Sequence, residues 1–196
     1  MSKTLYCIRH GLAEHNINYS KFGSKTFYDP NFVDTSLVKE GFDQAKQLRE
    51  SWKEIDDIEL VIVSPLQRTL QTAIEIFKEK EVPILSLEFV REYPLGKQTC
   101  NKRSPLSVLK KKYPRVNFHR FTSENDELWL SHREETLDEL NGRIEKFKQY
   151  LLHRPETKIA FINHGSFIGQ LKDNHIRYLD NHQEELKHCY PYVMKL

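Results

Sequence analysis

The chain has few cysteines, no long apolar run and almost no imbalance of charge, and each shortage argues against a class of protein. Its three cysteines are odd in number and lack metal-type spacing, so we expect neither a disulfide framework nor a cysteine-based metal site. The apolar runs fall far short of the ~20 residues that a membrane span requires. Lysine and arginine number 30 against 28 acidic residues, which gives no basic excess for nucleic acid.

Internal repeats, low-complexity segments and Gly/Ser linkers are absent too. We therefore predict one domain over residues 1–196, with the composition of an ordinary globular protein. The N-terminal stretch MSKTLYCIRHG contains only a short apolar run, which is too short for the core of a signal peptide. We expect a cytoplasmic protein in a reducing setting, with no membrane partner and no nucleic-acid partner; the oligomeric state is left open.

Short apolar runs rich in branched residues recur along the chain and predict strands. Such runs, followed by polar turns, are typical of strands buried on both faces of a mainly parallel sheet. The predicted strands are Leu5–Ile8, Leu60–Val63, Pro83–Val90, Ile159–Ile162 and Cys189–Met194.

Amphipathic stretches lie between these runs. Apolar residues recur at helical spacing from Val38 to Trp52, from Leu66 to Phe77 and from Leu137 to Leu151. Strands that alternate with amphipathic helices predict an α/β protein, with a three-layer α/β/α arrangement around a mainly parallel central sheet.

Residues 94–133 interrupt the alternation of strands and helices. They are basic and polar, and Pro105 and Pro114 divide them. We predict an irregular excursion with short helices at 105–112 and 125–131, folded over the edge of the sheet.

Reactive side chains follow each predicted parallel strand. Arg9-His10-Gly11 follows the first, Ser64 to Arg68 the second, Arg91-Glu92 the third, and Asn163 to Ser166 the last. The carboxyl ends of parallel strands share one edge of a sheet, and ligands bind at that edge. We therefore expect two histidines, two or three arginines and one carboxylate to converge there.

Arg9 and Arg68 suit a phosphate monoester, because a guanidinium binds its oxygens in a bidentate fork. Ser64 followed by Pro65 resembles a helix N-cap with proline at the first helical position. Arg68 would then lie in the first turn, beside backbone N–H groups that attract anions. This set of residues favours phosphoryl transfer.

His10 is the candidate nucleophile. Neighbouring arginines disfavour a second positive charge, so they lower the imidazole pKa and keep its nitrogen neutral. Attack on phosphorus would form a phosphohistidine and divide one difficult displacement into two easier steps. Glu92 is the candidate acid that protonates the leaving group, and Glu88 and Glu14 remain alternatives.

A metal site is not expected. The chain has nine histidines, but His10 and His15 are five positions apart and no His-x-x-x-His pair occurs. The basic run at 110–115 is interpreted as solvated surface. Lys102 and Arg103 follow Glu92 closely enough that they could cap its pocket, an alternative that the sequence leaves open.

Four motifs together resemble those of the histidine phosphatase superfamily, also called the phosphoglycerate-mutase-like family. Arg9-His10-Gly11 with Asn16 resembles its first motif, and SLVKEGFDQAKQL at 36–48 resembles its Leu-Thr-x-x-Gly helix, with Val38 where threonine is usual. SPLQRTLQTA at 64–73 and NHGSFIG at 163–169 resemble its Ser-Pro-x-x-Arg element and its second-histidine motif. The resemblance covers about residues 4–92 and 135–172.

The resemblance implies a phosphoglycerate-mutase-like fold, His10 as the phosphorylated nucleophile and Glu92 as the acid. It also implies that Arg9, Arg68 and His164 bind the transferred group with help from Asn16. The predicted catalytic residues are His10, Glu92, His164, Arg9 and Arg68, and the predicted substrate-binding residues are Arg9, Asn16, Arg68, His164 and Gly165. No metal and no organic cofactor is implied.

The predicted activity is a metal-independent phosphoric monoester hydrolase of the histidine acid phosphatase type, acting on a phosphorylated small molecule or phosphopeptide. Leu12-Ala13 replaces the Glu-Ser typical of cofactor-dependent glycerate mutases, and the chain is shorter than theirs. Both departures favour a phosphatase. A mutase and an inactive phosphate-binding module remain as alternatives, and the excursion at 94–133 is expected to cap the active site.

Overall fold

The computed structural model describes residues 2–176 and 186–196. Within these residues the sheet has the order β4-β3-β2-β5-β1-β6, in which only β6 runs antiparallel to its neighbour. The strands are β1 (Thr4–Arg9), β2 (Leu60–Val63), β3 (Ile84–Ser86), β4 (Val116–Asn117), β5 (Lys158–Asn163) and β6 (Pro191–Lys195).

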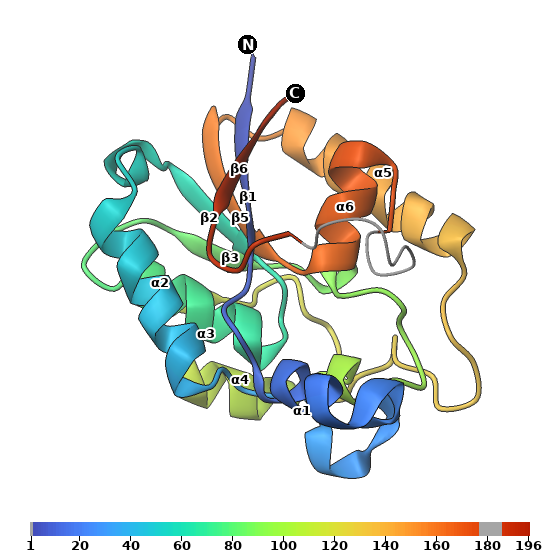
Figure 1. Cartoon of the computed structure of the whole chain (residues 1–196). Coiled ribbons are helices and arrows are strands. Elements are labelled where there is room, and N and C mark those ends of the chain that lie inside the picture. Colours follow the sequence, from blue (N-terminus) through green and yellow to red (C-terminus); the bar gives the residue numbers. More distant parts are fainter. Residues whose placement is uncertain (1, 177–185) are drawn as a thin grey trace.

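Helices cover both faces of this sheet, and α1 lies at the carboxyl end of its parallel strands (Figure 1). The α-helices are α1 (Glu14–Phe22), α2 (Lys39–Ser51), α3 (Gln67–Ile76), α4 (Leu106–Lys112), α5 (Leu137–Leu152) and α6 (Gly165–Asp173). Short 3₁₀ helices include η1 (Gly23–Tyr28), η2 (Pro30–Phe32), η3 (Ile55–Asp57), η4 (Glu88–Val90) and η5 (Thr99–Asn101). The predicted three-layer α/β/α class is confirmed.

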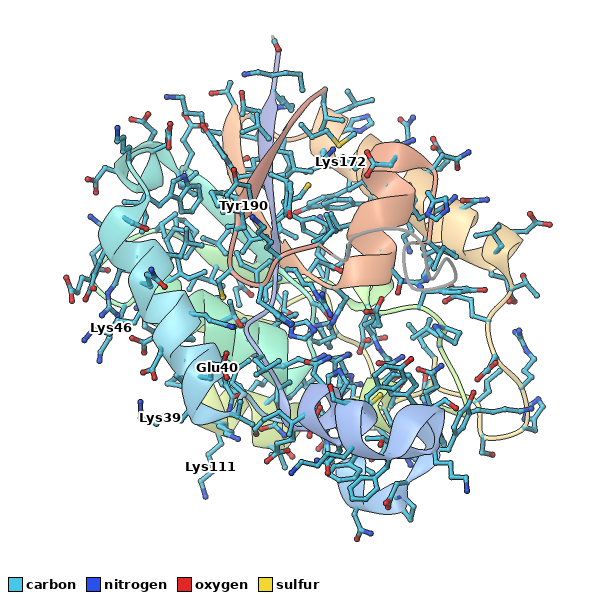
Figure 2. The ribbon with its side chains drawn as sticks, in the orientation of Figure 1. Lys39, Glu40, Lys46, Lys111, Lys172 and Tyr190 are labelled. Carbon is cyan, nitrogen blue, oxygen red and sulfur yellow. The ribbon has the colours of Figure 1, made fainter. Side chains whose placement is uncertain are left out.

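Two apolar cores lie on opposite faces of the sheet, because alternate residues of each strand point to opposite sides. In β1, Ile8 belongs to the core shared with α2, α3 and α4, whereas Cys7 belongs to the core shared with α5 and α6. The polar faces of the helices point outward, as Lys39 and Lys46 of α2 and Lys111 of α4 show (Figure 2). The central strands are thus buried, and they fix the positions of the residues that directly follow them.

The third predicted strand is shorter than expected. It ends at Ser86 rather than Val90, and η4 follows it. After Leu87 donates to the Val63 carbonyl, the Val90 carbonyl turns to accept from the Asn163 side chain instead of continuing the ladder.

The excursion contains one of its two predicted helices. The helix at 105–112 is confirmed as α4, but the helix at 125–131 is wrong. There the Asp126 carboxylate accepts from the backbone N–H groups of Leu128 and Trp129, and this local bonding competes with helix formation. The residues around Asp126 therefore form bends.

The predicted Ser64 N-cap is wrong as well. Helix α3 begins at Gln67, with Leu66 at its N-cap. The Gln67 N–H donates to the Asp34 carboxylate at 2.8 Å, so a residue remote in sequence caps the helix. The Ser64 hydroxyl is left to bond elsewhere.

Gly11 and Gly41 allow the β1–α1 turn to pack against helix α2. A Cβ on Gly11 would lie 2.4 Å from the Gly41 carbonyl oxygen, and a Cβ on Gly41 would lie 2.1 Å from the Leu12 carbonyl oxygen. Main-chain atoms cannot move aside as flexible side chains do. The turn that carries His10 is thus packed backbone to backbone.

We expect Gly11→Ala to lower the free energy of unfolding by about 1–3 kcal/mol, because the added methyl overpacks this contact. The matched control is Gly142→Ala in α5, where a Cβ would meet no atom within 4 Å. It should stabilise by about 0.5–1 kcal/mol through helix propensity. Urea denaturation measures both, and a Gly11→Ala variant as stable as the wild type would contradict the packing account.

Within the two described stretches, no helix is both long and apolar enough to cross a bilayer. Cys7, Cys100 and Cys189 are all free thiols in the buried interior.

Candidate active site

The end of β1 and the end of β5 bring two histidines together. These strands are parallel neighbours with Arg9 in register with Asn163. The next residues, His10 and His164, consequently lie side by side, with ring centroids 5.3 Å apart. Both rings are almost completely buried.

The protonation state of His10 follows from its surroundings. Its Nδ1 lies 2.7 Å from the Gly11 carbonyl oxygen. A carbonyl only accepts hydrogen bonds, so Nδ1 carries the proton and Nε2 keeps its lone pair. Burial, and then the positive charge of Arg68, lowers the His10 pKa well below its usual range. At neutral pH this imidazole is therefore uncharged, with a free lone pair on Nε2.

His164 is held in place as the N-cap of α6. Its Nε2 lies 2.8 Å from the Ser64 hydroxyl, and its backbone N–H donates to the Asn163 side chain at 2.7 Å. Burial, followed by Arg68, lowers its pKa well below the usual range. Its Nδ1 is buried and has no hydrogen-bond partner among the described residues.

Arg68 enters the site from the first turn of α3 with its guanidinium completely buried. One terminal nitrogen donates to the Cys100 carbonyl at 2.8 Å, and the other donates to Asn101 Oδ1 at 3.0 Å. Its buried Nε has no partner within the part of the chain that the structure describes. The excursion thus orients the arginine while leaving a donor for a ligand.

Arg9 and Gly165 lie against each other. Arg9 donates to the Leu186 carbonyl at 2.8 Å. A Cβ on Gly165 would lie 3.5 Å from Arg9 Nε, which is ordinary contact. Gly165 is also the first residue of α6, where backbone N–H groups are available for an anion.

Glu92 lies close enough to Arg68 and Arg9 for their charges to influence its carboxyl group. Its Oε1 accepts from the Tyr93 N–H at 2.8 Å. Burial raises its pKa, and the positive charges of Arg68 and Arg9 oppose that rise without reversing it. A carboxyl group with a raised pKa beside a phosphoryl pocket can donate a proton.

The two alternative acids have other contacts. Glu88 pairs with Arg103 at 2.6 Å and with Arg91 at 3.4 Å. Glu14 is exposed and accepts from the Ser36 N–H. Both carboxylates serve structural contacts, which leaves Glu92 as the carboxylate whose pKa reflects both Arg9 and Arg68.

Asn16 lies at the start of α1, and its side chain is partly used there. Its Oδ1 accepts from the Ala13 N–H at 3.0 Å, within the first turn. The Nδ2 amide is the group that could donate to a phosphoryl oxygen.

Comparison with known proteins identifies the family. Residues 5–188 match the histidine phosphatase superfamily (branch 1). The chain belongs to this superfamily.

Individual relatives agree with the assignment to the histidine phosphatase superfamily. Phosphoglycerate mutase-like protein 1 of Arabidopsis thaliana is 31% identical over 197 residues, which cover 85% of this chain and 69% of that protein. Among solved structures, Bacillus stearothermophilus YhfR has a TM-score of 0.62 at 20% identity, covering 98% of this chain and 90% of its own. The α-ribazole phosphatase of Shigella flexneri has a TM-score of 0.56 at 19% identity, covering 86% and 77%. The predicted phosphoglycerate-mutase-like fold is confirmed.

The sequence predicts two or three arginines at the site, and the structure places the third, Arg91, elsewhere. Arg91 is fully buried and binds both Asp126 oxygens at 2.6 Å. Arg103 is buried beside the same carboxylate, to which its N–H donates, and Lys102 lies over the Trp129 ring. These residues hold the excursion together, and no contact among the described residues places them over His10 and His164.

Two further histidines surround His10 and were not predicted as part of the site. The His15 ring centroid is 5.9 Å and the His188 ring centroid 5.6 Å from that of His10. His15 Nδ1 lies 2.6 Å from the Thr35 hydroxyl, and burial, followed by Arg68, lowers its pKa well below the usual range. His15 directly precedes Asn16, and this position beside a predicted site residue is the feature of the sequence that indicates its place in the site. His188 lies far along the chain and no motif marked it.

Proposed function

We propose that this histidine phosphatase superfamily member is a phosphomonoesterase that works through a phosphohistidine on His10. The observation that carries the proposal is the neutral, buried His10 beside His164. The charge of Arg68 influences the pKa of both His10 and Glu92. Membership of the superfamily supports a phosphatase activity. The geometry supports His10 as nucleophile, the arginines as anion-binding donors and Glu92 as acid.

In the first step His10 Nε2 attacks phosphorus, and the bond from phosphorus to the leaving oxygen breaks. Glu92 gives its proton to that oxygen, so an alcohol departs. Arg9, Arg68 and His164 bind the phosphoryl oxygens, with Asn16 Nδ2 and the Gly165 N–H as further donors. The charge that develops on the phosphoryl group is thereby matched by donors already in place.

In the second step water attacks the phosphohistidine. Glu92, now a carboxylate, takes the proton from the water, and the bond between phosphorus and Nε2 breaks. Inorganic phosphate leaves and His10 returns to its neutral form. No metal or organic cofactor enters either step.

The raised pKa of Glu92 predicts the pH dependence of the first step. The acid must be protonated when His10 attacks, so activity on alkyl phosphates should fall as pH rises through the Glu92 pKa. The lowered pKa of His10 keeps the nucleophile neutral on the acid side. A rate profile with its plateau in acid solution is therefore expected.

Glu92→Gln should slow hydrolysis of an alkyl phosphate roughly 10²–10³-fold, and slow that of a nitrophenyl phosphate far less. Aryl leaving groups depart as stable anions and need little protonation. Comparing kcat/KM on the two substrates measures this difference, because kcat/KM reports formation of the phosphohistidine and not its later hydrolysis. Glu14→Gln is the matched control because Glu14 is exposed. Equal losses on both substrates would remove Glu92 from the acid role.

A mutase is the second candidate, because a curated relative is named phosphoglycerate mutase-like. The two activities differ in what captures the phosphoryl group from His10. Incubation with a phosphoglycerate and with an aryl phosphate, each with and without chelator, separates them. Release of inorganic phosphate, unaffected by chelator, supports the phosphatase, whereas isomerised phosphoglycerate without phosphate release supports the mutase. Binding of vanadate without turnover of any substrate would indicate an inactive module.

A further inference from the structure

We propose that His188 is a positioning residue for the nucleophile, acting through a hydrogen bond from its Nδ1–H to the main-chain carbonyl of His10. This role rests on the proposed phosphohistidine chemistry at His10. It assigns a function to a histidine that no catalytic motif includes.

The placement of His188 is determined by both main chain and side chain. The main chain of His188 forms an isolated β-bridge with Arg9. The next residue, Cys189, donates its N–H to the Arg9 carbonyl at 2.9 Å. The imidazole then reaches back, so its Nδ1 is hydrogen-bonded to the His10 carbonyl oxygen and its ring centroid is 5.6 Å from that of His10. Since a carbonyl only accepts, His188 carries its proton on Nδ1.

His10 is thus held at three polar atoms. Its N–H donates to the Asn163 carbonyl at 2.9 Å, its Nδ1–H donates to the Gly11 carbonyl at 2.7 Å, and its carbonyl accepts from His188. The first bond is made to Asn163 at the end of β5, and the second to the adjacent residue Gly11. The third ties the nucleophile to the segment that leads into β6, and it is the bond that a single side-chain substitution can remove.

In-line attack on phosphorus is sensitive to such anchoring, because a misplacement of about 1 Å can cost about 10²-fold in rate. Weakening the anchor should therefore reduce kcat. It should leave KM nearly unchanged, since Arg9, Arg68 and His164 still bind the phosphoryl group.

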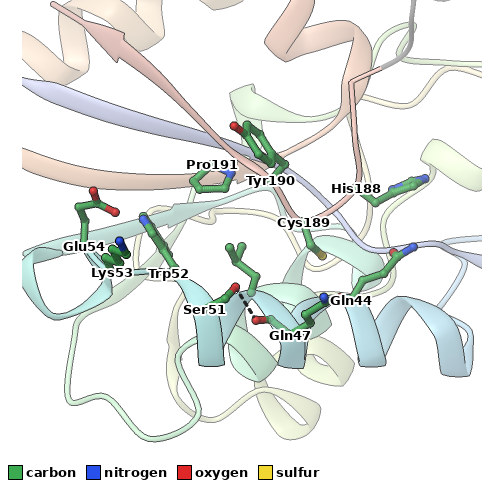
Figure 3. Close-up of a pocket in the computed structure, with 11 residues that line it drawn as sticks. Gln44, Gln47, Ser51, Trp52, Lys53, Glu54, His188, Cys189, Tyr190 and Pro191 are labelled. Atoms are coloured by element: carbon green, nitrogen blue, oxygen red, sulfur yellow. Dashed lines mark hydrogen bonds between the residues drawn. The ribbon is translucent and has the colours of Figure 1, made fainter.

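A cavity beside His188 indicates what would replace the imidazole. It has a volume of about 450 Å³ and lies between α2 and the residues leading into β6. His188 lines this cavity together with Gln44, Trp52 and Cys189, and its ring extends away from Trp52 (Figure 3). In His188→Ala, water from the cavity can reach the His10 carbonyl, so the fold keeps a hydrogen-bond partner while the fixed donor is lost.

Three variants test the positioning role. His188→Asn keeps an N–H donor near the position of Nδ1, His188→Gln moves that donor one bond outward, and His188→Ala removes it. We expect kcat to fall about 10–100-fold in His188→Ala, to fall less in His188→Gln, and to stay within about 3-fold of wild type in His188→Asn. KM should change by less than about 3-fold in each. His153→Ala, at an exposed position beyond α5, is the control and should match wild type.

Two outcomes would overturn the proposal: a His188→Asn variant as slow as His188→Ala, or losses that fall on KM rather than kcat. Urea denaturation identifies a variant that fails to fold, and the Asn and Gln variants then carry the comparison. Nitrogen-15 NMR of the wild-type imidazoles gives a readout that does not depend on turnover. It should show His188 protonated on Nδ1, and protonation on Nε2 alone would contradict the hydrogen bond. If the wild type has no activity, the proposed function fails while this spectroscopic test still stands.

Discussion

Replacing His10 by alanine is expected to lower kcat for aryl phosphate hydrolysis by about 10⁴-fold or more, because the nitrogen that attacks phosphorus is lost. Inorganic phosphate should still bind within about 10-fold of its wild-type affinity, since Arg9, Arg68 and His164 remain. A steady-state assay and a phosphate titration measure the two effects separately. Loss of rate with retained binding is the result that distinguishes a nucleophile from a binding residue.

The control for His10→Ala is His119→Ala, because His119 is exposed and bonded only to its neighbour Asn117 in the hydrogen bonds described. It should hydrolyse the aryl phosphate at the wild-type rate. Wild-type activity in His10→Ala itself would exclude His10 as the nucleophile and with it the covalent mechanism.

Replacing Arg68 is expected to have the second largest effect. Arg68→Ala should lower kcat roughly 10³-fold and Arg68→Lys about 10²-fold, because lysine keeps the charge but loses the planar fork. The guanidinium is completely buried and its two terminal nitrogens are held by Cys100 and Asn101, so the lysine ammonium cannot reproduce its donors. Steady-state kinetics give the losses, and urea denaturation reports whether the buried site still folds.

Asn101→Ala provides a graded version of the Arg68 test. It removes the Oδ1 that accepts from Arg68 while leaving the arginine and its second anchor, the Cys100 carbonyl. We expect a loss of about 10-fold in kcat, smaller than that of Arg68→Lys. An Arg68→Lys enzyme with wild-type kcat would show that bidentate binding by Arg68 is not used in the transition state.

The core of the site could be predicted because it depends on a simple geometric rule. Parallel strands end at one edge of a sheet, so residues that directly follow buried apolar runs must meet there. Arg9, His10 and His164 are placed by that rule alone. Arg68 is also brought to the same edge, although the helix that carries it begins at Gln67 rather than after Ser64.

The rest of the site depends on contacts that sequence spacing does not encode. Asn101 orients Arg68 across a loop, and Asp34 caps α3 from more than thirty positions away. His188 reaches His10 because β6 pairs with β1 at the edge of the sheet. Such pairings are set by the folded chain, and a lone histidine far along the chain carries no local signal.

Helix α1 and Arg91 illustrate two further limits of periodicity and position. The stretch EHNINYSKF has almost no apolar stripe, and His15 is the residue that α1 buries, so hydrophobic spacing did not mark it as a helix. Arg91 follows a strand region as Arg9 does, yet Asp126 binds it within the excursion. A charged residue at a strand end is therefore evidence for a functional site only when it forms no ion pair with a nearby residue of opposite charge.

The central claim is that His10 carries the phosphoryl group during turnover. Trapping of the phosphoenzyme by a rapid quench at alkaline pH tests this claim most directly. Wild-type enzyme mixed with a ³²P-labelled phosphomonoester and quenched in alkaline denaturant should retain label on a peptide containing His10. That label should be stable in base and lost in acid, as a phosphorus–nitrogen bond requires. With an aryl ester, whose leaving group needs little protonation, it should accumulate further in Glu92→Gln. A protein that releases phosphate without ever holding label on His10, or that holds it on another residue, would contradict the mechanism.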